Sequence, residues 1–275
     1  RDRNTPEYEL LDTGVFDGDR YFDVFVEYAK ADAEDVLIRI TACNRGPDTA
    51  PLHVLPTLLF RNTWSWAGGG SKPSLSKIDG TGQNVIHAHH SDALFQKFLD
   101  DYYLYCEGDV ALLFTENETN HERLYATPNA SPYVKDAFGR YLVNTQLDAI
   151  NPQQTGTKAA PHYQFSIDAG AAQTVRLRLS RKAPAKGGRP FADFDKVFST
   201  RIKEADEFYA TITPAATQAD QDRSRVMRQA LAGMLWTKQY FYYDVDKWLD
   251  EHKRTPEERK KMRNADWFHI VVEIL

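Results

Sequence analysis

Alternating apolar and polar side chains dominate the early part of the chain and predict β-strands. Residues 22–29 and 37–42 both change character at every second position, with an acidic turn at residues 30–35 between them. A period of two is typical of a strand whose side chains point to opposite faces of a sheet. We therefore expect an antiparallel strand pair, continued as a meander by a turn at residues 44–48 and a strand at residues 52–60.

Further strands are predicted by apolar, β-branched and aromatic runs along the next 120 residues. These runs are residues 83–89, 102–106, 110–114, 141–144, 162–167 and 173–179. Glycine-containing turns at residues 107–109 and 168–170 each favour a hairpin between the strands on either side. The first 182 residues are therefore expected to be mainly β and antiparallel.

The periodicity changes beyond residue 181 from two to the spacing of a helix. A linker at residues 183–190 contains Pro, Gly and Lys, and a helix is expected after it. The apolar residues at helical spacing are Phe194, Phe198, Ile202, Ala205 and Phe208. A second helix is expected from Asp222 to Trp248, and its aromatic run at residues 240–243 leaves two interpretations open. The helix is either buried on several sides or lines a cleft.

Composition narrows the classes of function. Hydrophobic residues make up 42% of the chain and charged residues 27%, as is typical of a globular protein with a substantial core. The net charge is −5 and no basic block is interleaved with aromatic residues, which argues against a nucleic-acid partner. Cys43 and Cys106 lie in strand-like runs and are expected to be buried thiols in a reducing compartment. Neither a secretory signal nor a long apolar span is found, so we expect a cytoplasmic chain without a membrane partner.

Residues 55–66 carry the most informative chemistry. An apolar run gives way to Arg61, Asn62, Trp64 and Trp66, and three glycines follow shortly afterwards. The pattern predicts a strand that ends in a loop, and loops held by a sheet often carry binding residues. Indole faces together with planar hydrogen-bonding groups suit a sugar. The alternative is that the two tryptophans only cap the core of the sheet.

Two other patterns suggest chemistry less strongly. Glu116 and Glu118 lie in one short loop, but the two carboxyl groups of a glycosidase face each other across the sugar and usually come from separate elements. We therefore favour loop-bracing hydrogen bonds for this pair, with ligand contact as the alternative. His87 and His89 would share one face of a strand and could hold zinc, but no third ligand has a recognisable spacing. A solvated or edge strand is the favoured interpretation.

Six segments taken together resemble the large bacterial proteins of glycoside hydrolase family 63, which are related to mannosyl-oligosaccharide glucosidase and mannosylglycerate hydrolase. One of them is Phe60-Arg61-Asn62-Thr63-Trp64-Ser65-Trp66, and another is Phe114-Thr115-Glu116-Asn117-Glu118-Thr119-Asn120. The others are residues 21–30, 129–136, 156–160 and 234–245. The resemblance covers nearly the whole chain up to about residue 269.

The resemblance implies an antiparallel β-sandwich at residues 1–182, a helical linker at residues 183–221, and the start of an (α/α)6 barrel at residues 222–275. It also implies hydrolysis with inversion, by a general acid and a general base that both lie on the barrel. In the family pattern, a segment like residues 263–267 is followed by a stretch leading to the catalytic aspartate. Residues 270–275 replace that stretch here. No catalytic residue is therefore assigned to this chain.

The leading hypothesis is a fragment of an inverting hydrolase of α-glucosides or related α-glycosides. Its expected partners are a carbohydrate and the remainder of its own barrel, with no metal ion or other cofactor. The expected substrate-binding residues are Arg61, Asn62, Trp64, Trp66, Glu118, Tyr133 and Lys135. The alternatives are a carbohydrate-binding module without catalysis and a scaffold domain that packs only against its own barrel.

Both ends of the sequence suggest a piece of a longer protein. The first residue is Arg1, and the apolar residues 270–275 are expected to have no strand left in the chain to pair with. A half-built barrel would also leave the apolar residues between Met227 and Trp248 uncovered. We therefore expect this chain alone to be poorly soluble or to self-associate.

Overall fold

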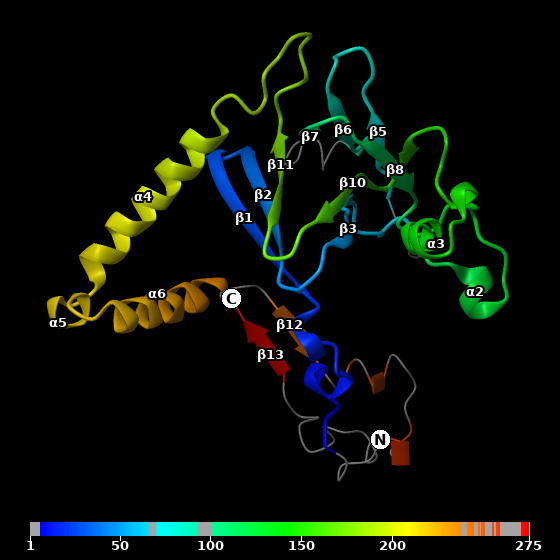
Figure 1. Ribbon diagram of the computed structural model, residues 1–275. Helices are drawn as coiled ribbons and strands as arrows, with labels where there is room; N and C mark the ends of the chain where they lie inside the picture. The colour runs from blue at the N-terminus through cyan, green and yellow to red at the C-terminus, as the bar shows by residue number, and fades with distance from the viewer. Residues whose placement is uncertain are drawn as a thin grey trace. The chain divides into compact units, whose positions relative to one another are not determined.

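A computed structural model describes residues 6–65, 70–92 and 101–237, and beyond them residues 241–244, 247, 249–250, 255, 257–258 and 271–274. The chain divides into two compact units (Figure 1). One is Gly14–Arg201, and the other combines Arg1–Thr13 with Ile202–Leu275. The expected fold class, mainly β with a large antiparallel β-sandwich followed by C-terminal helices, is confirmed.

The Gly14–Arg201 unit contains two sheets, and every strand pair in them is antiparallel among the described residues. In spatial order the larger sheet consists of β1 (Phe22–Asp32), β2 (Asp35–Asn44), β11 (Ala172–Ser180), β7 (Tyr102–Cys106), β6 (Asn84–His89), β5 (Ser74–Lys77) and β9 (Thr155–Gly156). The smaller sheet consists of β3 (Ala50–Val54), β10 (Lys158–Ile167), β4 (Leu58–Leu59) and β8 (Ala111–Thr115), with β8 also paired to β10.

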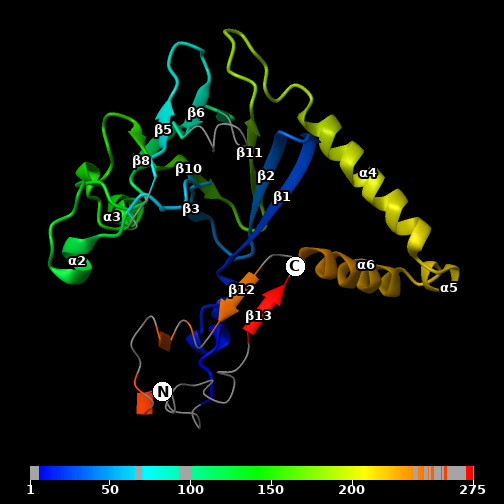
Figure 2. The ribbon, with the colours of Figure 1, turned by 180° about the vertical axis from the view of Figure 1, so that it is seen from behind.

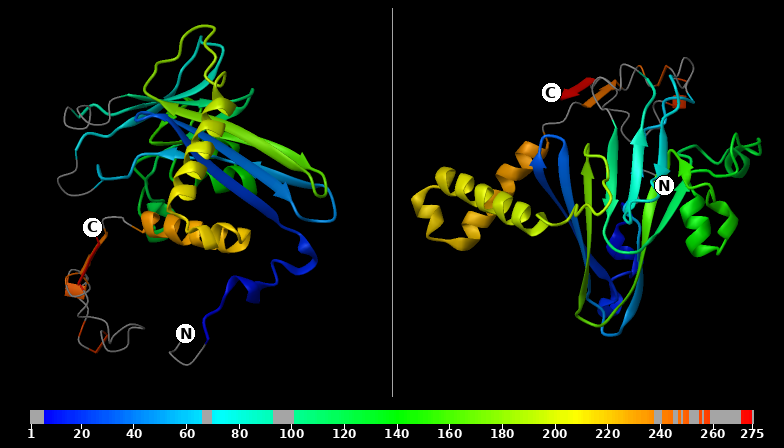
Figure 3. Two further views of the ribbon diagram at one scale, coloured as in Figure 1. Left: turned by 90° about the vertical axis from the view of Figure 1, so that its left-hand side faces the viewer. Right: turned by 90° about the horizontal axis from the view of Figure 1, so that it is seen from above.

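The main hydrophobic core lies between these two sheets, whose strands can be followed in Figure 3. The larger sheet contributes Ile86, Leu104 and Leu177, and the smaller sheet contributes Phe114 and Ala159. All five side chains are less than 5% exposed. Each large apolar side chain buried in this way contributes on the order of 1.5–3 kcal/mol, so this interface is the main stabilising element of the sandwich.

Helices cover the outer faces of both sheets. Phe138 of α3 (Ala137–Val143) packs with Leu113 and Ala160 of the smaller sheet. Phe194 and Phe198, in the first turns of α4 (Phe194–Ile212), pack with Ala29 and Leu37 of the larger sheet. The other short elements of this unit are η2 (Asp17–Asp19), α2 (His121–Tyr125) and η3 (Leu147–Ala149). Each sheet therefore has a helix packed against part of its outer face.

The predicted pairing of strands is right for β1 and β2 but wrong elsewhere. The expected meander ends at β2, because β3 pairs with β10 in the other sheet. Neither expected hairpin forms, since β7 and β8 lie in different sheets, as do β10 and β11. Gly108 and Gly170 have φ of 88° and 71°, and their short turns carry the chain across the sandwich. Period two fixes the faces of a strand, but it does not say which strand lies beside it.

Several predicted boundaries also differ from the structure. The strand expected at residues 52–60 is interrupted between Val54 and Leu58, because Pro56 has no N–H to donate to a ladder. The strand expected at residues 141–144 is the end of helix α3, whose Phe138 and Tyr141 have helical spacing and share one apolar cluster. β5 was not predicted, and β6 is flanked by β5 and β7 instead of being an edge strand.

The second unit contains η1 (Leu10–Thr13), α5 (Ala215–Gln218), α6 (Gln221–Trp236), β12 (Phe241–Asp244) and β13 (Val271–Ile274). The α6 helix begins where predicted, because the Asp220 side chain accepts hydrogen bonds from the backbone N–H groups of Asp222 and Arg223. It ends at Trp236, and the aromatic segment after it is a strand, as its β-propensity favours. β12 pairs with β13, so the expectation that residues 270–275 have no partner strand is wrong. Val245 and Trp248 lie outside the described residues.

Arg178 forms a buried ion pair that fastens the chain leading to α4. Its guanidinium donates to both carboxylate oxygens of Asp35, at 2.7 and 2.6 Å, and to Asp193 at 2.6 Å. Asp35 is 1% exposed and Arg178 is 7% exposed. We expect Arg178→Ala to lower the free energy of unfolding by about 3–5 kcal/mol, because Asp35 would stay buried without its cation. Urea unfolding followed by circular dichroism measures this loss.

The matched control is Arg20→Ala, which breaks an ion pair of 2.6 Å with Asp48 in which both side chains are more than 60% exposed. An exposed pair contributes little, so this variant should unfold almost like the parent. Equal losses in Arg178→Ala and Arg20→Ala would contradict the importance of the buried pair.

The lowered pKa of His162 should make the free energy of unfolding depend on pH. Burial and the neighbouring His53, whose Nδ1 lies 2.7 Å from His162 Nε2, lower the pKa of His162 below its ordinary value of 6.5. His162 therefore binds a proton more readily in the unfolded chain than in the folded chain. As pH decreases through 6.5 toward the pKa of folded His162, the free energy of unfolding should fall. His162→Gln should reduce this fall, measured by urea unfolding at about pH 7.5 and 5.5. An unchanged slope, or the same change in the exposed control His121→Gln, would contradict this origin.

Candidate functional site

Four segments that are far apart in the sequence meet at one corner of the sandwich. The loop at residues 116–120, which follows β8, contacts residues 60–65, residues 133–136 and residues 155–158. Helices α2 and α3 come after this loop in the chain and lie together beside β8 (Figures 1 and 2).

Asn117 connects three of these segments. Its side-chain amide donates to the carbonyl of Phe60 at 2.8 Å, and its own carbonyl accepts from Nδ2 of Asn62 at 3.1 Å. Its backbone N–H donates to Oγ1 of Thr157 at 2.8 Å. An asparagine offers both donors and acceptors, so one residue can hold several loops in fixed positions. The Trp64-containing loop is thereby fixed to the loop that carries the two glutamates.

The polar side chains at this corner form what we call the corner cluster: Trp64, Lys72, Glu116, Glu118 and Thr157. Lys72 Nζ lies 2.9 Å from Glu118 Oε1 and 3.1 Å from Glu116 Oε2. The indole Nε1 of Trp64 donates to Glu118 Oε1 at 2.9 Å, and Thr157 Oγ1 donates to Glu116 Oε2 at 2.7 Å. One ammonium therefore lies between two carboxylates, and one of these carboxylates orients the indole.

Contacts within the cluster favour the charged forms of Glu118 and Lys72. Burial alone would raise the pKa of Glu118, but hydrogen bonds from Lys72 and Trp64 hold this pKa below its ordinary value. Burial also acts to lower the pKa of Lys72, and the two carboxylates nevertheless raise it. A general acid needs a raised pKa, which Glu118 lacks. Glu118 therefore acts as a hydrogen-bond and charge partner that braces the loop, and Glu116 contacts Thr157 and Lys72 in the same network.

The predicted binding residues Asn62, Trp64, Glu118 and Lys135 come together around this cluster. The backbone N–H of Lys135 donates to the carbonyl of Glu118 at 2.9 Å, and its Nζ donates to Oγ1 of Thr119 at 3.2 Å. The half-buried Trp64 is oriented through its N–H, and Nζ of Lys72 lies over its ring, 6.0 Å from the centroid.

The other three predicted residues are less closely involved. The carbonyl of Tyr133 accepts from the N–H of Glu116 at 3.3 Å, so its backbone belongs to the corner. Arg61 is exposed beside the corner loop. Trp66 lies outside the described residues.

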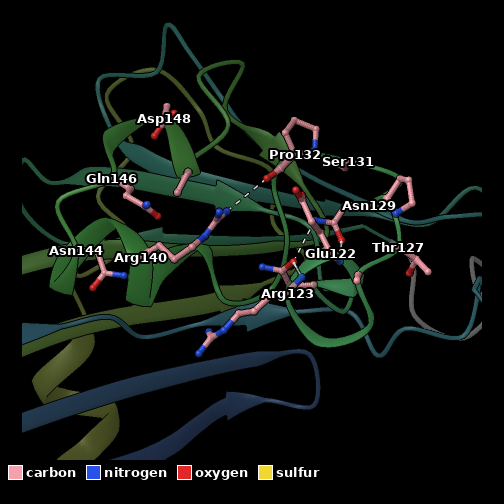
Figure 4. A pocket seen from close by; sticks show the side chains of 14 residues that line it. Glu122, Arg123, Thr127, Asn129, Ser131, Pro132, Arg140, Asn144, Gln146 and Asp148 are labelled. Carbon is pink, nitrogen blue, oxygen red and sulfur yellow. Dashed lines mark hydrogen bonds between the residues drawn. The ribbon is translucent and has the colours of Figure 1, made fainter.

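An open polar groove of about 1250 Å³ begins at Asn120, the last residue of the corner loop. It is lined by side chains from α2, α3, η3 and the loop between the two helices, and Figure 4 shows several of them. The labelled polar residues are Glu122, Arg123, Thr127, Asn129, Ser131, Arg140, Asn144, Gln146 and Asp148. Arg140 reaches from α3 toward Pro132, whose carbonyl accepts from Nη2 at 3.4 Å. Such a mixture of donors and acceptors suits a ligand with many hydroxyl groups.

Sequence reasoning missed this groove because residues 141–144 were predicted as a strand. The signal that could have found it is the spacing of Phe138 and Tyr141, which indicates a helix and gives Arg140 and Asn144 one common face. Nε of Arg140 is buried and makes no hydrogen bond among the described residues, although it lies 3.6 Å from Asp136 Oδ1. The Arg140 guanidinium is thus held between Asp136 and the Pro132 carbonyl at the edge of the groove.

Among the described residues, one group could hold a metal ion. It consists of His87, His89 and Asp101, whose ligand atoms lie within 4.8 Å of one another. His89 Nδ1 is 2.7 Å from Asp101 Oδ1, and His87 Nε2 is 3.1 Å from Oδ2. The third member was missed because Asp101 comes to the two histidines through the pairing of β6 with the adjacent β7, and its position in the sequence gives no indication of this.

The predictions on cysteines and membrane spans have clear outcomes. Both thiols are free, and Cys106 is buried whereas Cys43 is partly exposed. Burial raises the pKa of Cys106 far above its ordinary value, so this thiol is inert at neutral pH. Within the described part of the chain, none of the helices has the length and apolar character needed to span a membrane.

Comparison with known proteins adds one relative. No protein-family model matches the sequence. A Saccharomyces cerevisiae protein named "Uncharacterized protein YMR196W" is 35% identical over 291 aligned residues. The alignment covers 92% of this chain and 26% of the yeast protein. The chain therefore spans about a quarter of the length of the curated relative that it matches.

Gly156 gives a direct test of how the corner is held. A Cβ at this position would lie 2.3 Å from the carbonyl oxygen of Thr115 and 2.8 Å from its carbonyl carbon. Because these are backbone atoms next to Glu116, Gly156→Ala should lower the free energy of unfolding by about 1–3 kcal/mol. Gly139→Ala is the matched control, since nothing lies within 4 Å of its added Cβ in α3. Chemical denaturation measures the free energy of unfolding of both variants. If Gly156→Ala proved as stable as Gly139→Ala, the close approach of residue 156 to Thr115 would be contradicted.

Proposed function

We propose that this chain is the β-sandwich part of an inverting glycoside hydrolase that acts on α-glucosides or related α-glycosides. In this proposal the corner cluster and the adjoining groove help to shape the sugar-binding cleft. The catalytic acid and base belong to a helical barrel beyond this chain, which is its second partner besides the carbohydrate. The corner cluster itself carries no proton transfer.

The observation that carries the proposal is the meeting of four segments that resemble glycoside hydrolase family 63. Residues 60–65, 114–120, 129–136 and 156–160 each contribute to the corner, although up to 100 residues separate them. Lys158, from the last of them, donates through Nζ to the carbonyl of Lys135 at 2.7 Å. Residues that only stabilised separate parts of a sandwich would have no reason to gather at one corner.

The chemistry of the corner fits a carbohydrate better than a charged or apolar ligand. Trp64 presents an indole with a fixed orientation, and a sugar stacks its C–H face on such a ring. Asn62 and Lys135 lie beside it, and the groove lined by Arg140 and Asn129 continues from Asn120. Lys72 contacts both carboxylates of the corner cluster, so its charge is already paired and does not call for an anionic ligand.

Exposed apolar side chains support a further partner surface. Val24, Val26 and Tyr28 of β1 are about half exposed or more, as are Leu235 and Trp236 of α6. Exposed apolar surface on either unit, each taken by itself, can mark an interaction site. In the proposal, the barrel covers such surface, and self-association of the chain alone follows from leaving it open.

A carbohydrate-binding module without catalysis is the second candidate, because the oriented Trp64 and the open groove would serve binding equally well. A scaffold domain is the third. Under the third reading, Trp64 matters for stability, and no sugar binds.

The first experiment is calorimetric titration of the chain with α-linked glucose disaccharides. We expect binding without product, and at least a tenfold weaker binding by Trp64→Ala, since loss of one stacked ring costs on the order of 1–3 kcal/mol. Trp64→Phe should bind with intermediate affinity, because it keeps an aromatic face and loses the N–H that Glu118 holds. Trp236→Ala, which removes an exposed indole of the other unit, is the control and should bind normally.

A second measurement separates the proposals. The same sugars are given to the longer polypeptide of which we propose this chain is a part, and NMR follows the anomer released. Initial release of the β-anomer from an α-glucoside supports the inverting hydrolase. Binding without release supports the module, and an absence of binding by the parent chain and by the longer polypeptide supports the scaffold.

A further inference from the structure

The outer face of the larger sheet carries a polar group that the proposed function does not use. His87 and His89 lie on one face of β6, opposite to the face from which Ile86 and Ala88 enter the main core. Register places Ser76 of β5 beside His87 and Ser74 beside His89 on this same face. Two imidazoles in a half-buried polar setting are thereby held at a fixed spacing by a central strand.

Asp101 completes the group from the chain that enters β7. Its two carboxylate oxygens lie 2.7 Å from His89 Nδ1 and 3.1 Å from His87 Nε2. Nε2 of His87 is buried, and among the described residues its near polar neighbour is this carboxylate. Two ring nitrogens and a carboxylate therefore face the same small region.

We propose that His87, His89 and Asp101 bind one divalent transition-metal ion of the zinc type. Imidazole nitrogen and carboxylate oxygen bind Zn²⁺ at about 2.0–2.2 Å, so tetrahedral ligands on one ion lie roughly 3.3 Å apart. The contacts of 2.7 and 3.1 Å are a little shorter than that spacing, and all three ligand atoms lie within 4.8 Å, so binding requires modest shifts of the side chains in both directions. Two histidines and one carboxylate leave a coordination position for water.

Neighbouring side chains hold the ligands in place for an ion. The ring of Tyr103 stacks on His87, with centroids 4.9 Å apart and planes 10° apart. Tyr103 is also the register partner of His87 across β6 and β7, so the imidazole orientation is set by the sheet. Ligands that are oriented before the ion arrives lose less entropy on binding.

The same three residues could instead form only a hydrogen-bonded link between the two strands. In that case the carboxylate would serve as a shared acceptor for the two imidazoles, and no ion would bind. The clustering of all three ligand atoms within 4.8 Å favours the metal site, because one ion could then contact both imidazoles and the carboxylate.

The test is equilibrium dialysis of the full chain against Zn²⁺ after treatment with a chelator, with the bound metal measured by elemental analysis. We expect one Zn²⁺ per chain, and at least a tenfold loss of affinity in Asp101→Asn and His89→Ala, since even outer partners of a metal ligand account for about 10–100-fold. His121→Ala removes an exposed imidazole elsewhere and should leave binding unchanged.

His53→Ala is the sharper control, because His53 and His162 form another close pair of imidazoles, 2.7 Å apart. Loss of zinc binding in His53→Ala, retention in Asp101→Asn, or no binding by the parent chain would each overturn the proposal. NMR of the parent chain gives a reading that does not depend on the folding of any variant. Zn²⁺ should shift the imidazole signals of two histidines, His87 and His89, and shifts confined to other histidines would also overturn it.

This proposal does not rest on sugar binding. The stoichiometry of zinc and the affinity for disaccharides are separate readouts on different residues. If the chain bound no zinc, the measured affinity for disaccharides would be unaffected, and the reverse also holds.

Discussion

Strand β10 is the element on which the smaller sheet depends. It hydrogen-bonds to β3, β4 and β8, and none of these three pairs with any other strand among the described residues. Backbone groups buried without partners are costly, so the smaller sheet exists only while β10 lies between its neighbours. Just before β10, Gly156 passes against the backbone of Thr115, and the N–H of Thr157 donates to the Thr115 carbonyl at 3.0 Å. The same strand therefore positions both the sheet and the corner cluster.

Sequence patterns predicted those parts of the fold that are local. The β1 and β2 pair was found because period two and an acidic turn lie within about 20 residues of each other. Partners of β10 and β11 could not be found in this way, since Leu177 pairs with Cys106 across some 70 residues. The pattern of a strand indicates which of its faces is apolar. Which strand lies beside it depends on the packing of the whole sandwich.

For the candidate site, the sequence predicted several of the residues but not how they are arranged in space. Aromatic and amide groups around Trp64, and the carboxylate of Glu118, were identified from their chemistry, but the bond between them joins positions 54 residues apart. Arg140 was missed because a helix was taken for a strand. Asp101 was missed because strand pairing, and no spacing in the sequence, brings it to His87.

Strand β5 shows why the two polar groups share a scaffold and still remain distinct. Lys72 lies two residues before Ser74, the first residue of β5, and Ser74 pairs with His89 of β6. Loss of β5 would therefore displace the ammonium of the corner cluster and remove a neighbour of the histidine face together. Substitution of one ligand, such as Asp101, leaves the bonds of Lys72 to Glu116 and Glu118 in place. The sheet can thus carry two polar groups of different chemistry, because the side chains of each group contact one another and not those of the other group.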